Sequence, residues 1–258
     1  MVNSYQTLLT NLDSQGILTC TFNRPESRNA LNSEMVNELH QVLQDSRNNK
    51  KIRMLLFTGS GEKAFVSGAD ISELKNRTKD DALCQINSRL FREIENIPIP
   101  TLAVINGYAL GGGMEFAMAC DLRICGESAR FGQPEVGLGI IPGAGSCYRL
   151  PKLIGFGRAK ELIFSGKIID AKEAFEIGLV NKIAPDSQLM ENAKEFAGTI
   201  LKNSSMALQL AKTNLNQLNN LDHEFGMTLE SHAQAILFED PEKHERMQKF
   251  LDRKKDKK

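Results

Sequence analysis

Two isolated carboxylates in apolar surroundings are the side chains of this sequence best suited to chemistry. Glu115 lies two residues after the glycine triplet Gly111–Gly113, and its neighbours as far as Cys120 are apolar. Glu135 also stands alone, between Phe131-Gly132-Gln133-Pro134 and a glycine-rich apolar stretch. A buried acid is costly unless it has a partner or a purpose, and two carboxylates at one site suffice for acid–base catalysis at carbon. Each also has an ordinary interpretation, as a helix-start acid favoured by the dipole or as a solvent-facing loop residue.

Two glycine-rich turns add a place where negative charge is stabilised. Residues 64–70 follow the apolar stretch Arg53–Gly59, and residues 106–115 follow Thr101–Ile105. Ligands of open α/β proteins bind where such strands end. Three glycines at a helix start leave N–H groups unpaired at the positive end of the dipole, which suits an anion or a developing oxyanion. Tight strand–helix packing is the alternative use of these glycines.

The hydrophobic pattern supplies a scaffold for the turns and acids. Strands are expected at Thr7–Leu12, Ile17–Phe22, Arg53–Gly59, Thr101–Ile105 and Asp121–Cys125. Helices are expected from a cap at Asn32 or Ser33 to Asn48, over residues 80–97, and from Gly111 to Cys120. The alternation predicts an α/β core with mainly parallel strands.

The C-terminal part of the sequence has a different pattern. From Gly155 onward it is helical, apart from one short strand expected at Leu179–Ile183. We therefore divide the chain into a core with the active site, residues 1–195, and a helical C-terminal region, residues 196–258. The apolar faces of that region need a surface to cover them, on the core or on another subunit.

Composition argues against several classes of partner. Among the 258 residues, Lys plus Arg and Asp plus Glu both total 32, so the net charge gives no reason to expect a nucleic acid or a membrane. The five cysteines form no CxxC pair and their number is odd, which argues against a disulfide framework and against a zinc site. They favour a reducing compartment. A cytoplasmic protein is the simplest interpretation, and a mature organellar protein is the alternative.

Several stretches, in a fixed order, carry a family resemblance. They are Asn23-Arg24-Pro25 with Asn29-Ala30-Leu31-Asn32, then 65–71, 106–115 and 121–123, and last 131–135 and 139–145. In this order they resemble the crotonase, or enoyl-CoA hydratase/isomerase, superfamily, and the resemblance runs through nearly the whole chain. It implies a core of ββα units wound into a spiral, with a helical C-terminal trimerisation region. Assembly as a homotrimer or a dimer of trimers is implied as well.

The resemblance also assigns roles to particular residues. The backbone N–H groups of Ala69 and Gly112 correspond to the family's oxyanion hole, and Glu115 and Glu135 to the two catalytic glutamates of its hydratases. Gly143 is expected to position the attacking water or Glu135 by close backbone approach. The substrate is expected to be an acyl-CoA thioester, with CoA as part of the substrate and with no separate cofactor or metal.

The contacts to CoA are less well matched. The residues expected to make them are Arg24 or Arg28 at a phosphate, Ser67 and Asp70 near the adenine and pantetheine, and Phe250 and Lys254 from the C-terminal region. The family often has lysine directly after the Gly-Ala-Asp-Ile stretch, where this chain has Ser72. This chain therefore has no lysine at that position for a phosphate of CoA.

The glutamate pair predicts an enoyl-CoA hydratase, which reversibly adds water in the syn sense to a 2-enoyl-CoA and gives a 3-hydroxyacyl-CoA. Glu115 is expected to take a proton from the water that attacks C3, while protonated Glu135 delivers a proton to C2. An enoyl-CoA isomerase is the first alternative, since family isomerases often keep only the acid matching Glu135. A crotonase-fold module that binds RNA or a protein is the second, but the basic stretches Lys50-Lys51 and Lys254–Lys258 are short for that role.

Overall fold

The chain folds into one unit that holds two β-sheets and a second unit that is helical. The computed structural model describes residues 5–218 and 223–255. The two units are Met1–Ile200 and Leu201–Lys258. Among the described residues, no helix is both long enough and apolar enough to cross a membrane.

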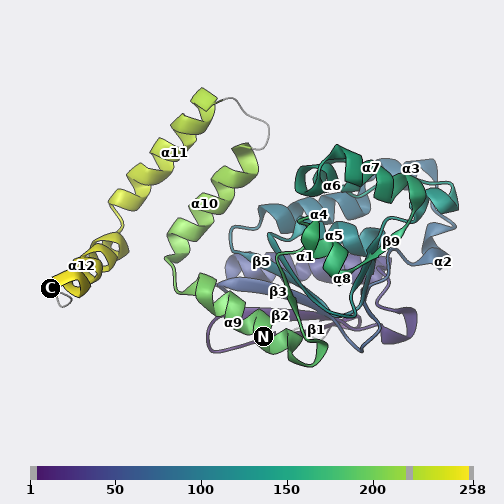
Figure 1. Cartoon of the computed structure of the whole chain (residues 1–258), viewed down its shortest axis with the longest axis horizontal. Helices are drawn as coiled ribbons and strands as arrows, with labels where there is room; N and C mark the ends of the chain where they lie inside the picture. The colour runs from purple at the N-terminus through teal and green to yellow at the C-terminus, as the bar shows by residue number, and fades with distance from the viewer. Residues whose placement is uncertain (1–4, 219–222, 256–258) are drawn as a thin grey trace. The chain divides into compact units, whose positions relative to one another are not determined.

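The first sheet has six strands in the order β1-β2-β3-β5-β7-β10. Figure 1 labels β1, β2, β3 and β5 of this sheet. Strand β1 pairs antiparallel with β2, and every following pair is parallel, which confirms the expected mainly parallel core. The bounds are β1 Leu8–Leu12, β2 Ile17–Phe22, β3 Met54–Gly59, β5 Thr101–Ile105, β7 Leu122–Gly126 and β10 Lys182–Ala184.

The second sheet is built from four three-residue strands in the order β4-β6-β8-β9. Their bounds are β4 Ala64–Val66, β6 Tyr108–Leu110, β8 Arg130–Gly132 and β9 Ile168–Asp170. Strands β4, β6 and β8 are parallel neighbours. The chain therefore repeats one pattern three times: a strand in the first sheet, a strand in the second sheet, then a helix.

The first unit also contains helices, and α2, α5 and α6 are the first α-helices after the three strand pairs. The bounds of the helices are α1 Ser33–Asn48, α2 Ile71–Leu74, α3 Lys79–Leu83, α4 Ile86–Asn96, α5 Gly112–Ala119, α6 Ser146–Ile154, α7 Phe156–Ser165, α8 Ala171–Glu176 and α9 Leu189–Leu201. Helix α1 begins as expected, because the Asn32 side chain accepts a hydrogen bond from the Met35 N–H. Helices α1, α4, α5 and α6 contact one another in that order.

Helix α5 is held in place by a cluster of phenylalanine rings. Phe116 lies edge-on to Phe22 and Phe57, with ring centroids 5.0 Å apart in both pairs, and to Phe91 at 5.5 Å. All four rings are fully buried. Edge-on aromatic pairs stabilise by about 0.5–1.5 kcal/mol beyond the area they bury. Because Phe116 follows Glu115 directly, the cluster also fixes the helix turn that carries this acid.

Three expectations about secondary structure were wrong. A single strand was expected after Gly155, but β9 at Ile168–Asp170 precedes β10. The helix expected over residues 80–97 is broken between α3 and α4, where Gln85 takes the left-handed conformation at φ 54°. Leu83 is 66% exposed there, so its helical spacing marks no buried face. The strand expected at Leu179–Ile183 begins only at Lys182, since the Leu179 carbonyl accepts a bond from the buried Arg123 side chain.

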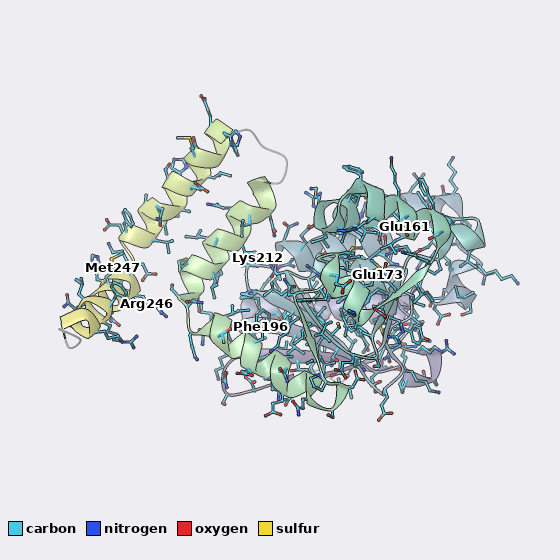
Figure 2. The ribbon with its side chains drawn as sticks, in the orientation of Figure 1. Glu161, Glu173, Phe196, Lys212, Arg246 and Met247 are labelled. Carbon is cyan, nitrogen blue, oxygen red and sulfur yellow. The ribbon has the colours of Figure 1, made fainter. Side chains whose placement is uncertain are left out.

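The second unit consists of helices α10 Ser205–Leu218, α11 His223–Phe238 and α12 Pro241–Lys255, close to the helices expected there. Arg246 on α12, labelled in Figure 2, pairs with Glu242 at 2.6 Å and donates to the Lys202 carbonyl at 2.9 Å. In the first unit, Lys167 links Glu161 of α7 to Glu173 of α8, at 2.7 and 3.0 Å (Figure 2). The Arg246–Glu242 pair lies within α12, whereas the bond to Lys202 and the two Lys167 pairs join segments that are separate in secondary structure.

Candidate active site

A cavity of about 760 Å³ lies where three neighbouring parallel strands, β4, β6 and β8, end. The turn after each strand lines it. Six of the residues expected at the site line this one cavity: Ser67, Ala69, Gly112, Glu115, Glu135 and Gly143. The sequence placed the turns after long strands of the first sheet, but a short strand of the second sheet comes between, and this sheet brings the turns together.

Gly111 and Gly113 of the triplet each meet a different requirement. Gly111 has φ 50°, and a Cβ there would lie 2.7 Å from an oxygen of Glu135. A Cβ on Gly113 would collide with the carbonyl oxygen of Val66, so α5 rests directly on the backbone of β4. Only glycine allows both the left-handed turn and this close approach.

The N–H groups of Ala69 and Gly112 face a common space. A Cβ on Gly112 would lie 3.5 Å from the Ala69 nitrogen. Backbone bonds on either side fix the turn around Ala69, from the Leu31 N–H to the Gly68 carbonyl and from the Asp70 N–H to the Leu31 carbonyl, both 2.8 Å. In the described parts of the chain neither N–H has a backbone acceptor, and Gly112 opens α5 at the positive end of its dipole. The pair suits a developing oxyanion.

Glu115 is almost completely buried in the first turn of α5, with 3% of its surface exposed. One oxygen accepts hydrogen bonds from the N–H groups of Ala144 and Ser146, at 2.8 and 3.0 Å. Burial raises the pKa of this carboxyl, and the two N–H bonds and the charge of Arg149 oppose the rise. Glu115 is thus a buried carboxylate with built-in support for its ionised form.

Glu135 begins a 3-10 helix, Glu135–Leu138, and is half-buried. Burial and then the charge of Glu115 raise the pKa of Glu135 to about 7. Its own backbone N–H opposes the rise, and within residues 5–218 and 223–255 it has no pair of loop N–H donors like the one at Glu115. Of the two carboxyls, Glu135 is therefore the one more readily kept protonated, ready to donate, and Glu115 the one more readily kept ionised, ready to accept a proton.

A buried polar link between the two acids was not expected from the sequence. When the fully buried Gln133 amide is oriented to satisfy its neighbours, its nitrogen donates to both oxygens of Glu135, at 3.0 and 3.1 Å. Its oxygen then accepts from the Ser146 hydroxyl at 2.7 Å. Gln133 stands two residues before Glu135, and this proximity was the only signal in the sequence. Ser146 follows a glycine-rich loop and gave none.

Two of the residues expected to bind CoA, Asp70 and Arg24, bond to each other. The Asp70 carboxylate caps α2 and bonds to Ser72 and to Arg24 Nη2, at 3.1 and 3.0 Å. The hydroxyl bond from Ser72 is the largest effect that lowers the pKa of Asp70. Arg24 also donates to the Ala30 carbonyl at 2.6 Å. Arg24, Asp70 and Ser72 therefore stabilise one another next to the Ala69 turn.

The remaining three residues lie elsewhere. Arg28 is exposed and lines a second, smaller cavity of about 300 Å³ with Lys63 and Tyr108. Phe250 lies on α12 in the second unit and is 59% exposed. Lys254 is on the same helix, and its side chain lies outside the described residues. None of these three is among the residues that line the larger cavity.

The chain is similar over nearly its whole length to proteins of one kind. Residues 13–257 match the family described as Enoyl-CoA hydratase/isomerase. The chain is 42% identical over 247 residues to the short-chain-enoyl-CoA hydratase of Clostridium acetobutylicum, with 95% of both chains covered. It is 41% identical over 235 residues to the crotonyl-CoA hydratase of Syntrophomonas wolfei, with 90% of both covered. A crystal structure of an enoyl-CoA hydratase from Bacillus anthracis has a TM-score of 0.92 at 36% identity and covers 96% of this chain and 97% of that chain.

Proposed function

Because the chain belongs to the enoyl-CoA hydratase/isomerase family, we propose that its larger cavity binds a 2-enoyl-CoA and adds water to the double bond. Relatives about 40% identical over nearly the full chain are hydratases, so this chain is an enoyl-CoA hydratase, as expected from its sequence. The expected α/β crotonase fold is confirmed as well. One observation carries the assignment of residues: two acids and two N–H donors line the same cavity.

The N–H groups of Ala69 and Gly112 are proposed to hold the thioester oxygen. When a nucleophile adds at C3, electron density moves through C2 to that oxygen, and the thioester becomes an enolate. Donors already oriented toward this oxygen stabilise the new charge without having to reorganise. The contacts that fix Ala69 and Gly113 keep the two donors oriented in this way.

The two glutamates are proposed to divide the proton transfers. Ionised Glu115 accepts a proton from the water as its oxygen bonds to C3, and protonated Glu135 delivers a proton to C2 as the enolate collapses. The product gains the hydroxyl of the water at C3 and the proton of Glu135 at C2, while the other proton of the water stays on Glu115, so the two acids must exchange one proton, directly or through solvent, before the next turnover. Dehydration uses the same groups with their roles exchanged. The loop N–H groups at Glu115 and the raised pKa of Glu135 support this assignment.

The direct test is hydration of crotonyl-CoA, followed by the loss of its enoyl absorbance, with longer enoyl-CoAs assayed in parallel. Hydration without added metal or cofactor is the expected result. The alternative, an isomerase, would instead move the double bond of a 3-enoyl-CoA into conjugation, and the same absorbance would rise. Absence of hydration at every chain length would contradict the proposal. RNA binding is disfavoured by the balanced net charge.

The pH profile of kcat/KM is expected to be bell-shaped, because Glu115 and Glu135 must together hold one proton. Above about pH 7 the proton leaves Glu135, whose pKa is raised to about 7, and kcat/KM falls about tenfold for each pH unit. At low pH the pair takes up a second proton on Glu115 and activity is lost again. Hydration and dehydration start from forms of the enzyme with the same number of protons, so their kcat/KM profiles should coincide. A kcat/KM that does not fall above about pH 7 would contradict the role of protonated Glu135.

Replacing Gly112 by Pro is expected to lower kcat by about 10²–10³-fold, because it deletes one N–H donor of the oxyanion hole. Proline is tolerated at the first residue of a helix, where the N–H makes no intrahelical bond. Gly112→Ala is the matched control: its added Cβ would be in ordinary contact, 3.5 Å from the Ala69 nitrogen, and it keeps the N–H. Similar kcat values for the two variants would mean that this N–H does not stabilise the transition state.

Assembly, location and CoA contacts are further parts of the proposal. Helices α11 and α12 expose apolar side chains, which favours contact with other copies; they include Met227, Ile236, Phe238, Met247 and Leu251. A homotrimer or dimer of trimers, located in the cytoplasm, is proposed, with Ser67 and Asp70 near the pantetheine and with Arg28, Phe250 and Lys254 as outer CoA contacts. Light scattering should give three or six times the 28.7 kDa mass of one chain, and a monomer would contradict the proposed assembly.

A further inference from the structure

The loop before α6 holds Glu115 and is itself held at three successive carbonyl groups. The N–H groups of Ala144 and Ser146 both donate to one oxygen of Glu115, at 2.8 and 3.0 Å. Gly145 lies between them with φ 128°, a conformation that favours glycine. The orientation of these peptide groups therefore decides where the Glu115 carboxylate lies and how well its charge is stabilised.

The outer two peptide groups of the loop are oriented from their carbonyl side. In a planar trans peptide the C=O and the N–H point in opposite directions, so fixing one fixes the other. The Ser88 hydroxyl donates to the Gly143 carbonyl at 2.8 Å, which orients the N–H of Ala144. The backbone N–H of Arg149 donates to the Gly145 carbonyl at 2.8 Å, which orients the N–H of Ser146.

The middle peptide group is held by the side chain of Arg149. Its Nη1 donates to the Ala144 carbonyl at 3.0 Å, and the guanidinium lies so close to Gly145 that a Cβ there would collide with it. Glu95 of α4 fixes the other side of the guanidinium, at 2.9 Å from Nη2 and 3.4 Å from Nε. Arg149 is 5% exposed. A buried guanidinium with a two-point carboxylate partner has little freedom to move.

The charge of Arg149 acts on the same carboxylate. It opposes the rise in the pKa of Glu115 that burial causes. The other titratable groups near Glu115 are Glu135, whose pKa is raised by burial and by Glu115, and Cys147, whose thiol pKa is raised by burial and by both acids. Arg149 is the cation whose charge favours ionised Glu115 among the described residues.

We propose that Arg149, fixed by Glu95, is a positioning residue for hydration: it sets the loop that holds Glu115 and keeps Glu115 ionised while the water is activated. Arg149 itself is not among the residues that line the cavity. The inference rests on the proposed function, in which Glu115 is the base. It adds a residue of α6 and a residue of α4 that act on the reaction only through Glu115.

The test compares Arg149→Met, Arg149→Lys and Glu95→Gln with the wild-type chain and with the control Arg47→Met. Arg47 also pairs with a glutamate of α4, Glu93, at 3.4 Å, but both side chains are 38% exposed. Four properties are measured: kcat and KM for crotonyl-CoA, the pH profile of kcat/KM, binding of the saturated butyryl-CoA, and thermal unfolding. A fifth measurement needs no activity: the titration of the Glu115 carboxyl by ¹³C NMR, assigned by the loss of its signal in Glu115→Gln.

Arg149→Met is expected to lower kcat at least about tenfold with KM within about threefold, and to move the acidic limb and the Glu115 titration by about 0.5–1 pH unit to higher pH. Arg149→Lys keeps the positive charge, so the acidic limb of its kcat/KM profile should stay near that of the wild type. Its kcat should fall less than that of Arg149→Met. Glu95→Gln should lower kcat about threefold, and Arg47→Met should change nothing.

The proposal is overturned if folded Arg149→Met keeps wild-type kcat, or loses activity while the limb and the titration stay in place. If Arg149→Met does not fold, wild-type kcat in both Arg149→Lys and Glu95→Gln overturns it. A wild-type chain without hydratase activity would instead contradict the proposed function, and the NMR titration would still decide whether Arg149 acts on Glu115.

Discussion

Replacing Glu115 by Gln is expected to lower kcat for crotonyl-CoA hydration by about 10³–10⁴-fold, the upper range for loss of a general base. The amide keeps the size of the carboxylate and an oxygen that accepts from the Ala144 and Ser146 N–H groups, so the loop should stay in place. What is lost is the group that takes the proton from water. Butyryl-CoA binding and thermal unfolding should remain close to those of the wild type, because the oxyanion donors and the core are unchanged.

Two comparisons make this result specific. Glu127→Gln changes an exposed acid of the same unit and should leave kcat unchanged. Removing the charge of Glu115 also removes the repulsion that raises the pKa of Glu135, so Glu135 should titrate at lower pH in the variant. A Glu115→Gln enzyme that retains hydration within tenfold of the wild type would show that another group activates the water. If it retains double-bond migration instead, the isomerase alternative is favoured.

Replacing Glu135 by Gln is the second change with a large expected effect, a loss of about 10³-fold in kcat. The amide has no proton to deliver to C2, so the enolate reverts to substrate instead of collapsing to product. The kcat/KM profile should also lose the limb near pH 7, because that limb reports the proton on Glu135, whose pKa is about 7. Steady-state assays across pH measure both effects in one series.

The double variant, Glu115→Gln with Glu135→Gln, tests whether the acids work as a pair. Residues that act as a unit give strongly non-additive losses. The double variant should therefore be no more than about tenfold slower than the slower single variant, with the remaining rate due to the oxyanion donors and substrate positioning. Fully multiplicative losses would contradict a shared step.

The sequence predicted the long elements of the fold because their patterns are strong. Strand β2 was predicted at its observed bounds, Ile17–Phe22, and the cap at Asn32 is present. The three-residue strands β4, β6 and β8 were missed because three residues are too few to show a period of two. Tyr108–Leu110 was interpreted as part of a turn, although it is a strand beside β4 and β8.

Site residues could be predicted from the sequence only where their type is unusual for the surrounding stretch. Glu115 and Glu135 stood out because an acid is rare in an apolar stretch. Ser146, Ser88 and Glu95 did not, because their contribution depends on which carbonyl, amide or cation they meet across the fold, at distances in sequence such as the 55 residues between Ser88 and Gly143. The carboxylate partner of Arg149, Glu95, lies on another helix, and no local pattern in the sequence indicates this pair.

The direct seating of helix α5 on strand β4 at Gly113 and Val66 bears on how such a protein evolves. Main chain rests on main chain at this point, so with glycine at position 113 the distance between α5 and β4 there does not depend on side-chain size at position 66, while the phenylalanine cluster holds the rest of the helix. Substitutions elsewhere around the cavity leave the Ala69 and Gly112 amides in place as long as positions 111 and 113 stay glycine. Under the proposed function, new side chains at positions 115 and 135 would meet a thioester oxygen held by the same two amides, and the scaffold is open to other reactions of the same class of ester.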